Sequence, residues 1–386
     1  MGIIRADLVS LKERFGTPRR TEIVATDDNG SLAIEDLIAD EEMVITISHA
    51  GYIKRVPTNT YRTQNRGGRG LVGIKTKEED FVEHLFVAST HTYLLLFTDR
   101  GRCYWLKVYE IPTGTRQARG RSILTLVAAQ PDEKITAYVP TRDFPEDRYL
   151  LLATRNGTIK KTPLSAYGNP RRNGIVAIDL RDGDALIGAN LTDGDREVLL
   201  ATRQGKAIRF HEKDVRAMGR TAAGVRGIAL ARENDAVVGM VVVHDGSATI
   251  LVVTENGYGK RTPVDEYRLQ TRGGQGIINV RTSDRNGEVV AIKAVSDQDE
   301  IMIISSQGQI IRLGVKQISV LGRATQGVHL INTGDEDVVV VNVAHLVIED
   351  ENDNNEGAPE SNGTSGTEND GEAEGTGGSE DAGDTE

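Results

Sequence analysis

The first apolar stripe of the chain has the spacing of a helix. Ile4, Leu8, Leu11 and Phe15 recur every three or four residues, and Gly16 follows the last of them. Such a stripe predicts a short amphipathic helix, and a glycine directly after it is a common stop signal. The helix is short and has a single apolar face, which favours packing against something outside this chain.

From residue 43 onward the hydrophobic pattern changes to short runs of Val, Ile, Leu and Thr separated by turn residues, which predicts β-hairpins. One glycine marks each hairpin, and successive marker glycines are 50, 56, 48, 52 and 51 residues apart. A Ser or Thr stands three residues before every one of them. The chain is therefore expected to contain six repeats of about fifty residues. The glycines are Gly51, Gly101, Gly157, Gly205, Gly257 and Gly308, and the hydroxyl residues are Ser48, Thr98, Thr154, Thr202, Thr254 and Ser305.

A second glycine follows the first by 17 to 22 residues in each repeat. Each repeat has room for three or four strands, which is too few for independent stability. Radial stacking of six such sheets would bury their faces and leave only short edges exposed. We therefore expect an all-β fold, a six-bladed propeller-like disc. The second glycines are Gly70, Gly120, Gly174, Gly227, Gly276 and Gly327.

The end of the chain has no apolar pattern. Residues 349–386 hold 14 Asp and Glu, no Lys or Arg and no aromatic residue, a composition that predicts disorder. Such a tail could simply be a solubilising end, or it could imitate DNA and compete for a basic surface. The expected organisation is a helix end and linker over 1–30, the bladed domain over 31–348 and the disordered acidic tail over 349–386.

Charge is distributed unevenly along the chain. The formal net charge is −11, but without the tail 43 acids face 46 bases, so the bladed part is slightly basic. A single cysteine, Cys103, excludes an intrachain disulfide and a Cys-x-x-Cys site. No apolar run has membrane-spanning length. These features favour a cytoplasmic location.

Basic residues recur at fixed positions within the repeats. Five repeats carry a base four residues after the hairpin glycine, and arginines also surround the second glycine. Residues at the same position of each repeat lie at equivalent places around the disc, so these bases predict a belt on its outer rim. A continuous belt suits a polyanion, because each neutralised phosphate releases counterions. The alternative for any single base is an exposed strand end that merely aids solubility. The proposed rim residues are Lys54, Arg55, Arg116, Arg119, Arg121, Lys160, Lys161, Arg171, Arg172, Arg209, Arg220, Arg226, Lys260, Arg261, Arg272, Arg312 and Arg323.

The sharpest local motif places two arginines among glycines that allow close backbone approach to a phosphate. It resembles the gyrase A box, Gln-Arg-Arg-Gly-Gly-Lys-Gly, of the C-terminal domain of bacterial DNA gyrase A, and agrees at five of seven positions. Similar stretches elsewhere, such as 51–54, 118–121, 215–219, 256–262 and 325–328, extend the resemblance over residues 10 to 348. The motif consists of Gln64, Asn65, Arg66, Gly67, Gly68, Arg69 and Gly70.

The resemblance implies a six-bladed β-pinwheel whose blades exchange strands and whose edge wraps double-stranded DNA. It implies that the wrap is right-handed and gives gyrase its negative-supercoiling direction, with Arg66 and Arg69 locking the wrap. The implied partners are DNA, the gyrase A breakage-reunion domain and gyrase B. The gate tyrosine and the ATPase, with its ATP and Mg²⁺, would lie outside this chain, which is expected to be monomeric, bacterial and nucleoid-associated, with no catalytic, cofactor or metal residues of its own.

Three other functions remain as alternatives. The equivalent domain of topoisomerase IV also has basic blades, but typically a degenerate box and fewer repeats. A propeller that acts as a protein-interaction scaffold would have apolar rim patches, whereas aromatic residues here are only 4%. A propeller hydrolase would need carboxylates or metal ligands that converge on the central channel, and the seven histidines show neither metal-ligand spacing nor a common repeat phase.

Overall fold

The computed structural model describes residues 2–16, 34–58, 82–115, 118–130, 132–244, 248–307, 310–332 and 338–346. Two α-helices lie in this part of the chain, α1 (Gly2–Phe15) and α2 (Ile123–Val127). The predicted N-terminal helix is confirmed, and the Gly16 amide donates to the Lys12 carbonyl at 2.8 Å where the helix ends. Short 3-10 turns are η1 (Ile34–Leu37), η3 (Val108–Glu110), η4 (Leu164–Tyr167), η5 (Glu212–Asp214), η6 (Val264–Glu266) and η7 (Val315–Gln317).

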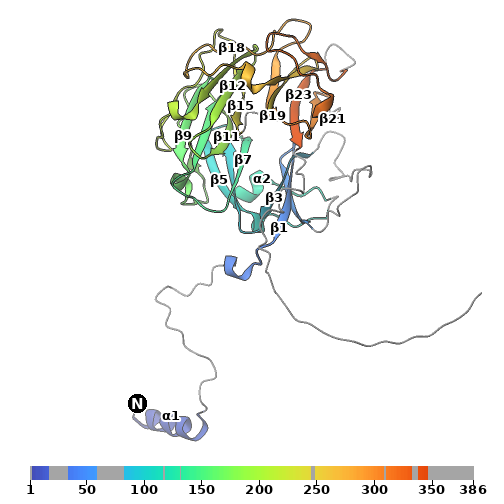
Figure 1. Ribbon diagram of the computed structural model, residues 1–386. Helices are drawn as coiled ribbons and strands as arrows, with labels where there is room; N and C mark the ends of the chain where they lie inside the picture. The colour runs from blue at the N-terminus through green and yellow to red at the C-terminus, as the bar shows by residue number, and fades with distance from the viewer. Residues whose placement is uncertain are drawn as a thin grey trace, which may run out of the picture. The chain divides into compact units, whose positions relative to one another are not determined.

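The strands form six sheets arranged as the blades of a ring (Figure 1). The predicted all-β, six-bladed fold is confirmed. Five blades have four described strands and the sixth has three. From the innermost strand outward, blade 1 is β3 (Val82–Ser89), β1 (Glu42–Ser48), β2 (Tyr52–Pro57) and β6 (Arg121–Ser122), and blade 2 is β7 (Ile135–Thr141), β4 (Tyr93–Thr98), β5 (Arg102–Lys107) and β10 (Ile175–Val176). In the same order, blade 3 is β11 (Leu186–Thr192), β8 (Tyr149–Thr154), β9 (Thr158–Pro163) and β14 (Val225–Arg226), and blade 4 is β15 (Val237–Val243), β12 (Glu197–Thr202), β13 (Lys206–His211) and β18 (Ile277–Ile278). Blade 5 is β19 (Val289–Val295), β16 (Thr249–Thr254), β17 (Tyr258–Pro263) and β22 (Val328–His329), and blade 6 is β23 (Val340–Leu346), β20 (Glu300–Ser305) and β21 (Ile310–Gly314).

The outermost strand of each four-stranded blade comes from the following repeat. Strand β6 follows β5 of blade 2 along the chain, yet it pairs with β2 of blade 1, where Tyr52 lies opposite Ser122. A parallel bridge between Arg55 and Thr113 holds the preceding loop to the same strand. Each such segment therefore runs along the outer edge of the neighbouring blade, and we call it a cap. The caps are cap 1 (112–122), cap 2 (168–176), cap 3 (216–226), cap 4 (268–278) and cap 5 (319–329), numbered by the blade that each completes.

The innermost strands contact one another around the ring. Strand β7 contacts β11, β11 contacts β15, β15 contacts β19 and β19 contacts β23. Strand β23 contacts β3, which joins the last blade to the first. The rings of His84 on β3 and Tyr138 on β7 pack with their centroids 4.9 Å apart. The six inner strands therefore enclose a central channel.

The residue pattern of the hairpins has a direct structural cause. The backbone amide of the turn glycine donates to the residue three before it, as Gly205 does to Thr202 at 3.0 Å. Gly205 has a φ of +80°, a conformation that glycine adopts without the steric strain of a Cβ. The Thr202 hydroxyl accepts a hydrogen bond from the Lys206 amide at 3.3 Å, so it closes the same turn from the other side. Ser48, Thr98 and Thr154 accept the equivalent bond.

The hydrophobic core lies between blades. Residues 94 to 97 of the second blade are a continuous apolar run, and all four side chains are fully buried. A strand enclosed on both faces is expected to show such a run rather than alternation. Leu94 and Leu96 pack in a cluster with residues of blade 1, whereas Leu95 and Phe97 pack in a cluster with residues of blade 3. The same arrangement repeats through the cluster between blades 5 and 6.

In each of the five described caps, the glycine directly before the cap strand allows the cap to approach its blade closely. A Cβ on Gly276 would lie 2.3 Å from the Ala207 carbonyl oxygen, and the residue has a φ of +69°. In the fourth repeat the assignment of Gly227 to this role was wrong. Gly224, with a φ of +93°, directly precedes β14 and approaches the Ile159 carbonyl. Two glycines three residues apart in the sequence caused the error.

Candidate nucleic-acid interface

The caps segregate charge. All five contain arginine, and none contains Asp or Glu. Because the caps form the outer edge of the blades, this composition favours a positive potential along the rim. The cap arginines are Arg116, Arg119 and Arg121 in cap 1, Arg171 and Arg172 in cap 2, Arg216, Arg220 and Arg226 in cap 3, Arg268 and Arg272 in cap 4, and Arg323 in cap 5.

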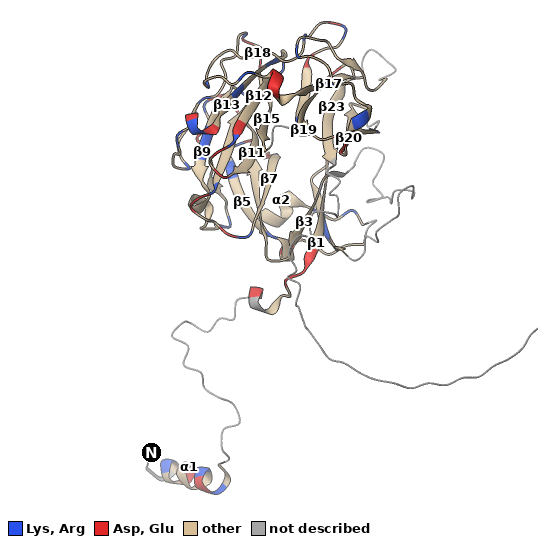
Figure 2. Cartoon of the chain, in the orientation of Figure 1, with Lys and Arg blue, Asp and Glu red and all other residues tan. Residues whose placement is uncertain are grey.

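Most cap arginines reach solvent, and Figure 2 shows basic segments along the outer loops of the blades. Arg119 lies with its guanidinium carbon 3.8 Å from the centre of the Tyr52 ring, a cation–π contact that fixes its direction. Three others are half-buried and bonded to backbone carbonyls. The exposed group is Arg119, Arg121, Arg171, Arg172, Arg216, Arg226 and Arg268, and the half-buried group is Arg220, Arg272 and Arg323.

Three connectors at the opposite ends of the strands are acidic. The connectors from one blade to the next leave the ends away from the hairpins, and they include residues 142–148, 193–196 and 296–299. These three segments hold seven Asp and Glu against three Arg. Repulsion between these carboxylates and phosphate would keep a nucleic acid away from this edge. The charge pattern therefore favours binding of a nucleic acid along the caps and not along the connectors.

Five of the proposed rim bases are buried, and three of them stand at position three after the hairpin glycine. The side chains of Lys54, Lys160 and Lys260 are fully buried. The expectation that they lie exposed was wrong, because position three after the hairpin glycine points beneath the cap. Each ammonium group donates to backbone carbonyls of the covering segments and so fixes a cap to its blade. Lys54 donates to Thr115 at 3.3 Å, Lys160 to Ala177 at 2.6 Å and to Arg220, and Lys260 to Gly322 at 2.7 Å and to Arg323 at 2.5 Å.

Burial changes the protonation of these lysines. Loss of hydration disfavours the charged form and lowers the pKa of Lys54 and of Lys260 to about 8. The pKa of Lys160 falls to about 7, since the positive charge of Arg220 adds to the effect of burial. These lysines occur in blades 1, 3 and 5, and Tyr104 and Ile208 occupy the same position in blades 2 and 4. Their role in the described structure is to hold the caps.

Bases at position four after the hairpin glycine are also engaged with the protein. Lys161 is buried and its ammonium nitrogen lies 3.3 Å from a carboxylate oxygen of Glu212. Arg261 is buried, donates to the Ile318 carbonyl at 2.9 Å and pairs with Asp297. These side chains therefore offer little surface to a ligand. Likewise, Arg209 donates to the carbonyls of Val264 and Tyr267 and pairs with Glu197, Arg55 is half-buried, and the exposed Arg312 pairs with Glu300.

The most specific sequence motif lies outside the described residues. This applies to Gln64, Asn65, Arg66, Gly67, Gly68, Arg69 and Gly70, and also to Arg116. The proposed organisation of residues 17–33 and 347–386 lies outside them too. The contact of residues 64–70 and Arg116 with DNA stays a prediction.

Two rim arginines escaped the sequence analysis. Arg216 and Arg268 are exposed and occupy the same position of caps 3 and 4, each directly after the buried residue that follows the 3-10 turn. Spacing from the glycines did not single them out. The complete lack of acids in the cap segments was the signal that could have found them.

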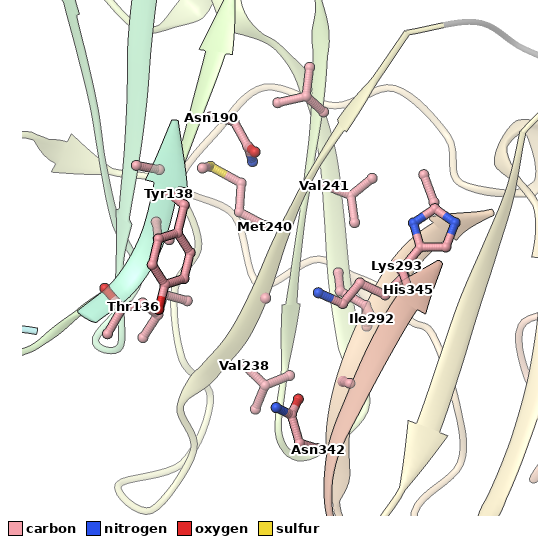
Figure 3. A pocket seen from close by; sticks show the side chains of 18 of the residues that line it. Thr136, Tyr138, Asn190, Val238, Met240, Val241, Ile292, Lys293, Asn342 and His345 are labelled. Atoms are coloured by element: carbon pink, nitrogen blue, oxygen red, sulfur yellow. The ribbon is translucent and has the colours of Figure 1, made fainter. Parts of the chain in front are cut away.

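The central channel contains a cavity of about 380 Å³, shown in Figure 3. Tyr138, Asn190, Lys293 and His345 line it together with apolar residues from the inner strands. The described lining contains no Asp or Glu, so it lacks the paired carboxylates of a propeller hydrolase. No group of three or more possible metal-ligating side chains occurs among the described residues. None of the helices in this part of the chain is long and apolar enough to span a membrane.

Comparison with known proteins identifies relatives over the whole bladed region. The chain is 48% identical over 340 residues to the DNA gyrase A protein of Salmonella typhimurium, covering 88% of this chain and 38% of that protein. It is 46% identical over 368 residues to the DNA gyrase A protein of Staphylococcus aureus, covering 95% of this chain and 41% of that protein. The chain therefore spans about two fifths of the length of these relatives.

Solved structures share the fold. The C-terminal domain of DNA topoisomerase IV matches with a TM-score of 0.70 at 28% identity, over 80% of this chain and 94% of that one. The DNA gyrase A C-terminal domain matches with a TM-score of 0.63 at 28% identity, over 80% of this chain and 100% of that one. The family model "DNA gyrase C-terminal domain, beta-propeller" matches six segments, 42–89, 92–137, 148–193, 196–244, 248–296 and 299–343, one for each blade. With six matched blades, strand-exchanged caps and gyrase A relatives, the chain belongs to the DNA gyrase C-terminal domain family of β-propellers.

Proposed function

We propose that this chain binds duplex DNA without sequence preference and wraps it along the caps, which gives DNA gyrase its negative-supercoiling direction. The observation that carries the proposal is the acid-free composition of five consecutive caps, each at the outer edge of a blade. Arginines at this edge can contact phosphates around successive blades. The acidic connectors at the other end of the strands confine the path.

Wrapping requires contacts spread over several blades. Bending 20 to 30 base pairs through 40 to 90° costs on the order of 1 to 6 kcal/mol. Phosphate contacts supply sequence-independent affinity that grows with their number and weakens steeply with salt. Exposed arginines on caps 1, 2, 3 and 4 provide such contacts at several points of the rim. The box residues Arg66 and Arg69 would add contacts and lock the wrap.

In the parent enzyme this chain would act without chemistry of its own. The gyrase A relatives are more than twice its length. We assign strand breakage to the breakage-reunion domain of gyrase A, and ATP hydrolysis with its Mg²⁺ to gyrase B, both in the bacterial cytoplasm at the nucleoid. The chain alone would then bind DNA as a monomer and neither cleave it nor need a cofactor.

Ligation of nicked circular DNA tests wrapping directly. The chain is bound to a singly nicked plasmid, the nick is sealed, the protein is removed and the linking number is read on a gel. A positive shift that grows with protein concentration is expected for a right-handed wrap. Binding without any shift would refute wrapping.

A matched pair of variants tests where the DNA lies. Substituting Arg171, Arg226 and Arg268 by alanine removes three exposed cap charges. Substituting Arg100, Arg142 and Arg203 removes three exposed charges off the caps, each of which pairs with a carboxylate. We expect the first triple variant to lose most of the linking-number shift and the second to keep it. Equal losses would contradict a DNA path along the caps.

The second candidate is the function of a topoisomerase IV C-terminal DNA-binding domain, with DNA bound to this chain but not wrapped around it. The TM-score of 0.70 to such a domain favours this candidate over the two non-DNA alternatives. The same ligation assay separates the two candidates, since only a wrapping domain shifts the linking number in proportion to the bound protein.

A further inference from the structure

Neighbouring caps are joined to one another by a repeated pair of hydrogen bonds. With Gly224 assigned in place of Gly227, an arginine stands four residues before the glycine in caps 3, 4 and 5. In each case a guanidinium nitrogen donates to the carbonyl of the last residue of the preceding cap strand. The bonds run from Arg220 to Val176 at 3.2 Å, from Arg272 to Arg226 at 3.0 Å and from Arg323 to Ile278 at 2.8 Å.

A backbone hydrogen bond accompanies each arginine. The amide of the residue three positions beyond the preceding cap strand donates to the carbonyl two residues before the cap glycine. The three bonds run from Asp179 to Ala222 at 3.3 Å, from Ala229 to Gly274 at 2.9 Å and from Arg281 to Thr325 at 3.1 Å. Each of the junctions from cap 2 to cap 5 is therefore fixed at two points in the same geometry.

The arginines of these junctions differ from the exposed cap arginines. Arg272 donates from Nε to the Asp214 carbonyl at 2.9 Å as well as from Nη1 to Arg226, so two bonds fix its plane. Arg226 and Arg268 are exposed and have no hydrogen bond from their guanidinium groups in the described structure. A planar guanidinium can satisfy two carbonyls in fixed directions, and an ammonium group cannot reproduce that geometry.

The first junction is built differently. Cap 2 is shorter, and Pro170 stands four residues before its glycine, Gly174. Helix α2 directly follows cap 1, whereas caps 2, 3 and 4 are followed by segments that are not helical. Arg102 on β5 of blade 2 donates to the Asn173 carbonyl of cap 2 at 2.5 Å, but this bond joins a blade to its own cap and not one cap to the next. The paired bonds are therefore a feature of junctions 2–3, 3–4 and 4–5.

We propose that Arg220, Arg272 and Arg323 are positioning residues that set the angle between successive caps, and thereby the curvature imposed on bound DNA, separately from its affinity. The inference rests on the proposed wrapping function. A duplex in contact with several caps follows their relative orientation. Variation in the angle between neighbouring caps therefore reduces the writhe that the chain constrains in the DNA, even when the phosphate contacts remain. Charge supplies the binding, and junction geometry supplies the bend.

The test is a triple substitution that keeps charge, Arg220→Lys, Arg272→Lys and Arg323→Lys, in the full chain. The matched control is Arg100→Lys, Arg142→Lys and Arg203→Lys, which changes three exposed arginines that lie off the caps. Affinity for a linear duplex, its salt dependence and the linking-number shift per bound protein are measured for each. We expect the junction variant to keep its affinity within about twofold while its linking-number shift falls at least twofold, and the control to keep both.

Two outcomes would overturn the inference. An unchanged linking-number shift in the junction variant shows that the arginines do not set curvature. A parallel loss of affinity and shift shows that they act as ordinary phosphate contacts. If the triple variant does not fold, Arg272→Lys alone is measured in the same way and judged by the same two outcomes. Absence of any shift with the unmodified chain refutes the wrapping function itself, which distinguishes the two failures.

Discussion

The carbonyl oxygen of Ala207 lies 2.3 Å from the point where a Cβ on Gly276 would stand. Cap 4 can pair with blade 4 only because Gly276 has no side chain. Gly276→Ala adds a steric clash with backbone to the strain of a positive φ. We expect it to lower the free energy of unfolding by about 2 to 3 kcal/mol, measured by urea denaturation.

The control for this substitution is Gly183→Ala. Gly183 has a φ of +71°, close to that of Gly276, but no atom lies within 4 Å of its Cβ position. It isolates the conformational strain, which costs about 1 to 2 kcal/mol. Equal effects of the two substitutions would show that close packing of the cap is unimportant.

Removal of a hairpin hydroxyl should weaken one blade. Thr202→Val keeps the shape of the side chain but leaves the Lys206 amide without its acceptor. The expected loss in the free energy of unfolding is about 1 kcal/mol. Thr221→Val, at an exposed threonine of cap 3, should change it by less than about 0.5 kcal/mol. An unaffected Thr202 variant would contradict the role assigned to the repeated Ser and Thr.

Buried Lys160 should make stability depend on pH. Its pKa is about 7 in the folded chain and 10.5 in an ordinary environment. Between these values the unfolded chain binds more protons, so the contribution of Lys160 raises the free energy of unfolding as pH increases. Lys160→Met removes this contribution. Between pH 7 and pH 9 we expect the free energy of unfolding of the variant to rise less, or fall more steeply, than that of the unmodified chain. The slopes of the two proteins should differ by at most about 1.4 kcal/mol per pH unit.

Urea titrations of both proteins at each pH give the difference, in which other titrating groups cancel. The control is Lys316→Met, because Lys316 is exposed. Its pH profile should follow that of the unmodified chain. Parallel profiles for the Lys160 variant and the unmodified chain would mean that the lysine keeps an ordinary pKa.

Arg226 should contribute one phosphate contact. Arg226→Ala is expected to weaken duplex binding uniformly across DNA sequences and to reduce the slope of log affinity against log salt by about 1. The backbone carbonyl that accepts from Arg272 remains in this variant. Arg142→Ala, on the acidic edge, should leave affinity and slope unchanged. Fluorescence anisotropy over a series of salt concentrations measures both quantities, and a slope equal to that of the unmodified chain would remove Arg226 from the interface.

The sequence predicted the fold well because its strongest signals come from local backbone chemistry. Gly51 and Gly101 recur with a Ser or Thr three residues earlier because these hairpins need a positive φ and a hydroxyl acceptor. Such requirements depend on neighbours in the chain. The number of blades and the hairpin positions follow from them directly.

The candidate site was predicted less well, because exposure depends on residues distant in the sequence. Lys160 resembles a surface base beside Lys161, but a cap from the next repeat covers it. The spacing of these residues within the repeats placed them on the outer hairpin strands, but it could not show whether a cap covers them. The predicted cap arginines that are exposed, such as Arg171 and Arg226, lie on the outermost segment of their blade, where no later described segment covers them.

The exchange of caps between repeats has a consequence for how the number of blades can change. Excision of one whole repeat removes three strands and also the cap of the preceding blade. The repeat that then follows brings an equivalent cap, with its glycine at the same phase, to the vacated edge. In-frame loss or duplication of an internal repeat therefore leaves every described four-stranded blade with a cap, so the ring can shrink or grow during evolution in steps of one blade.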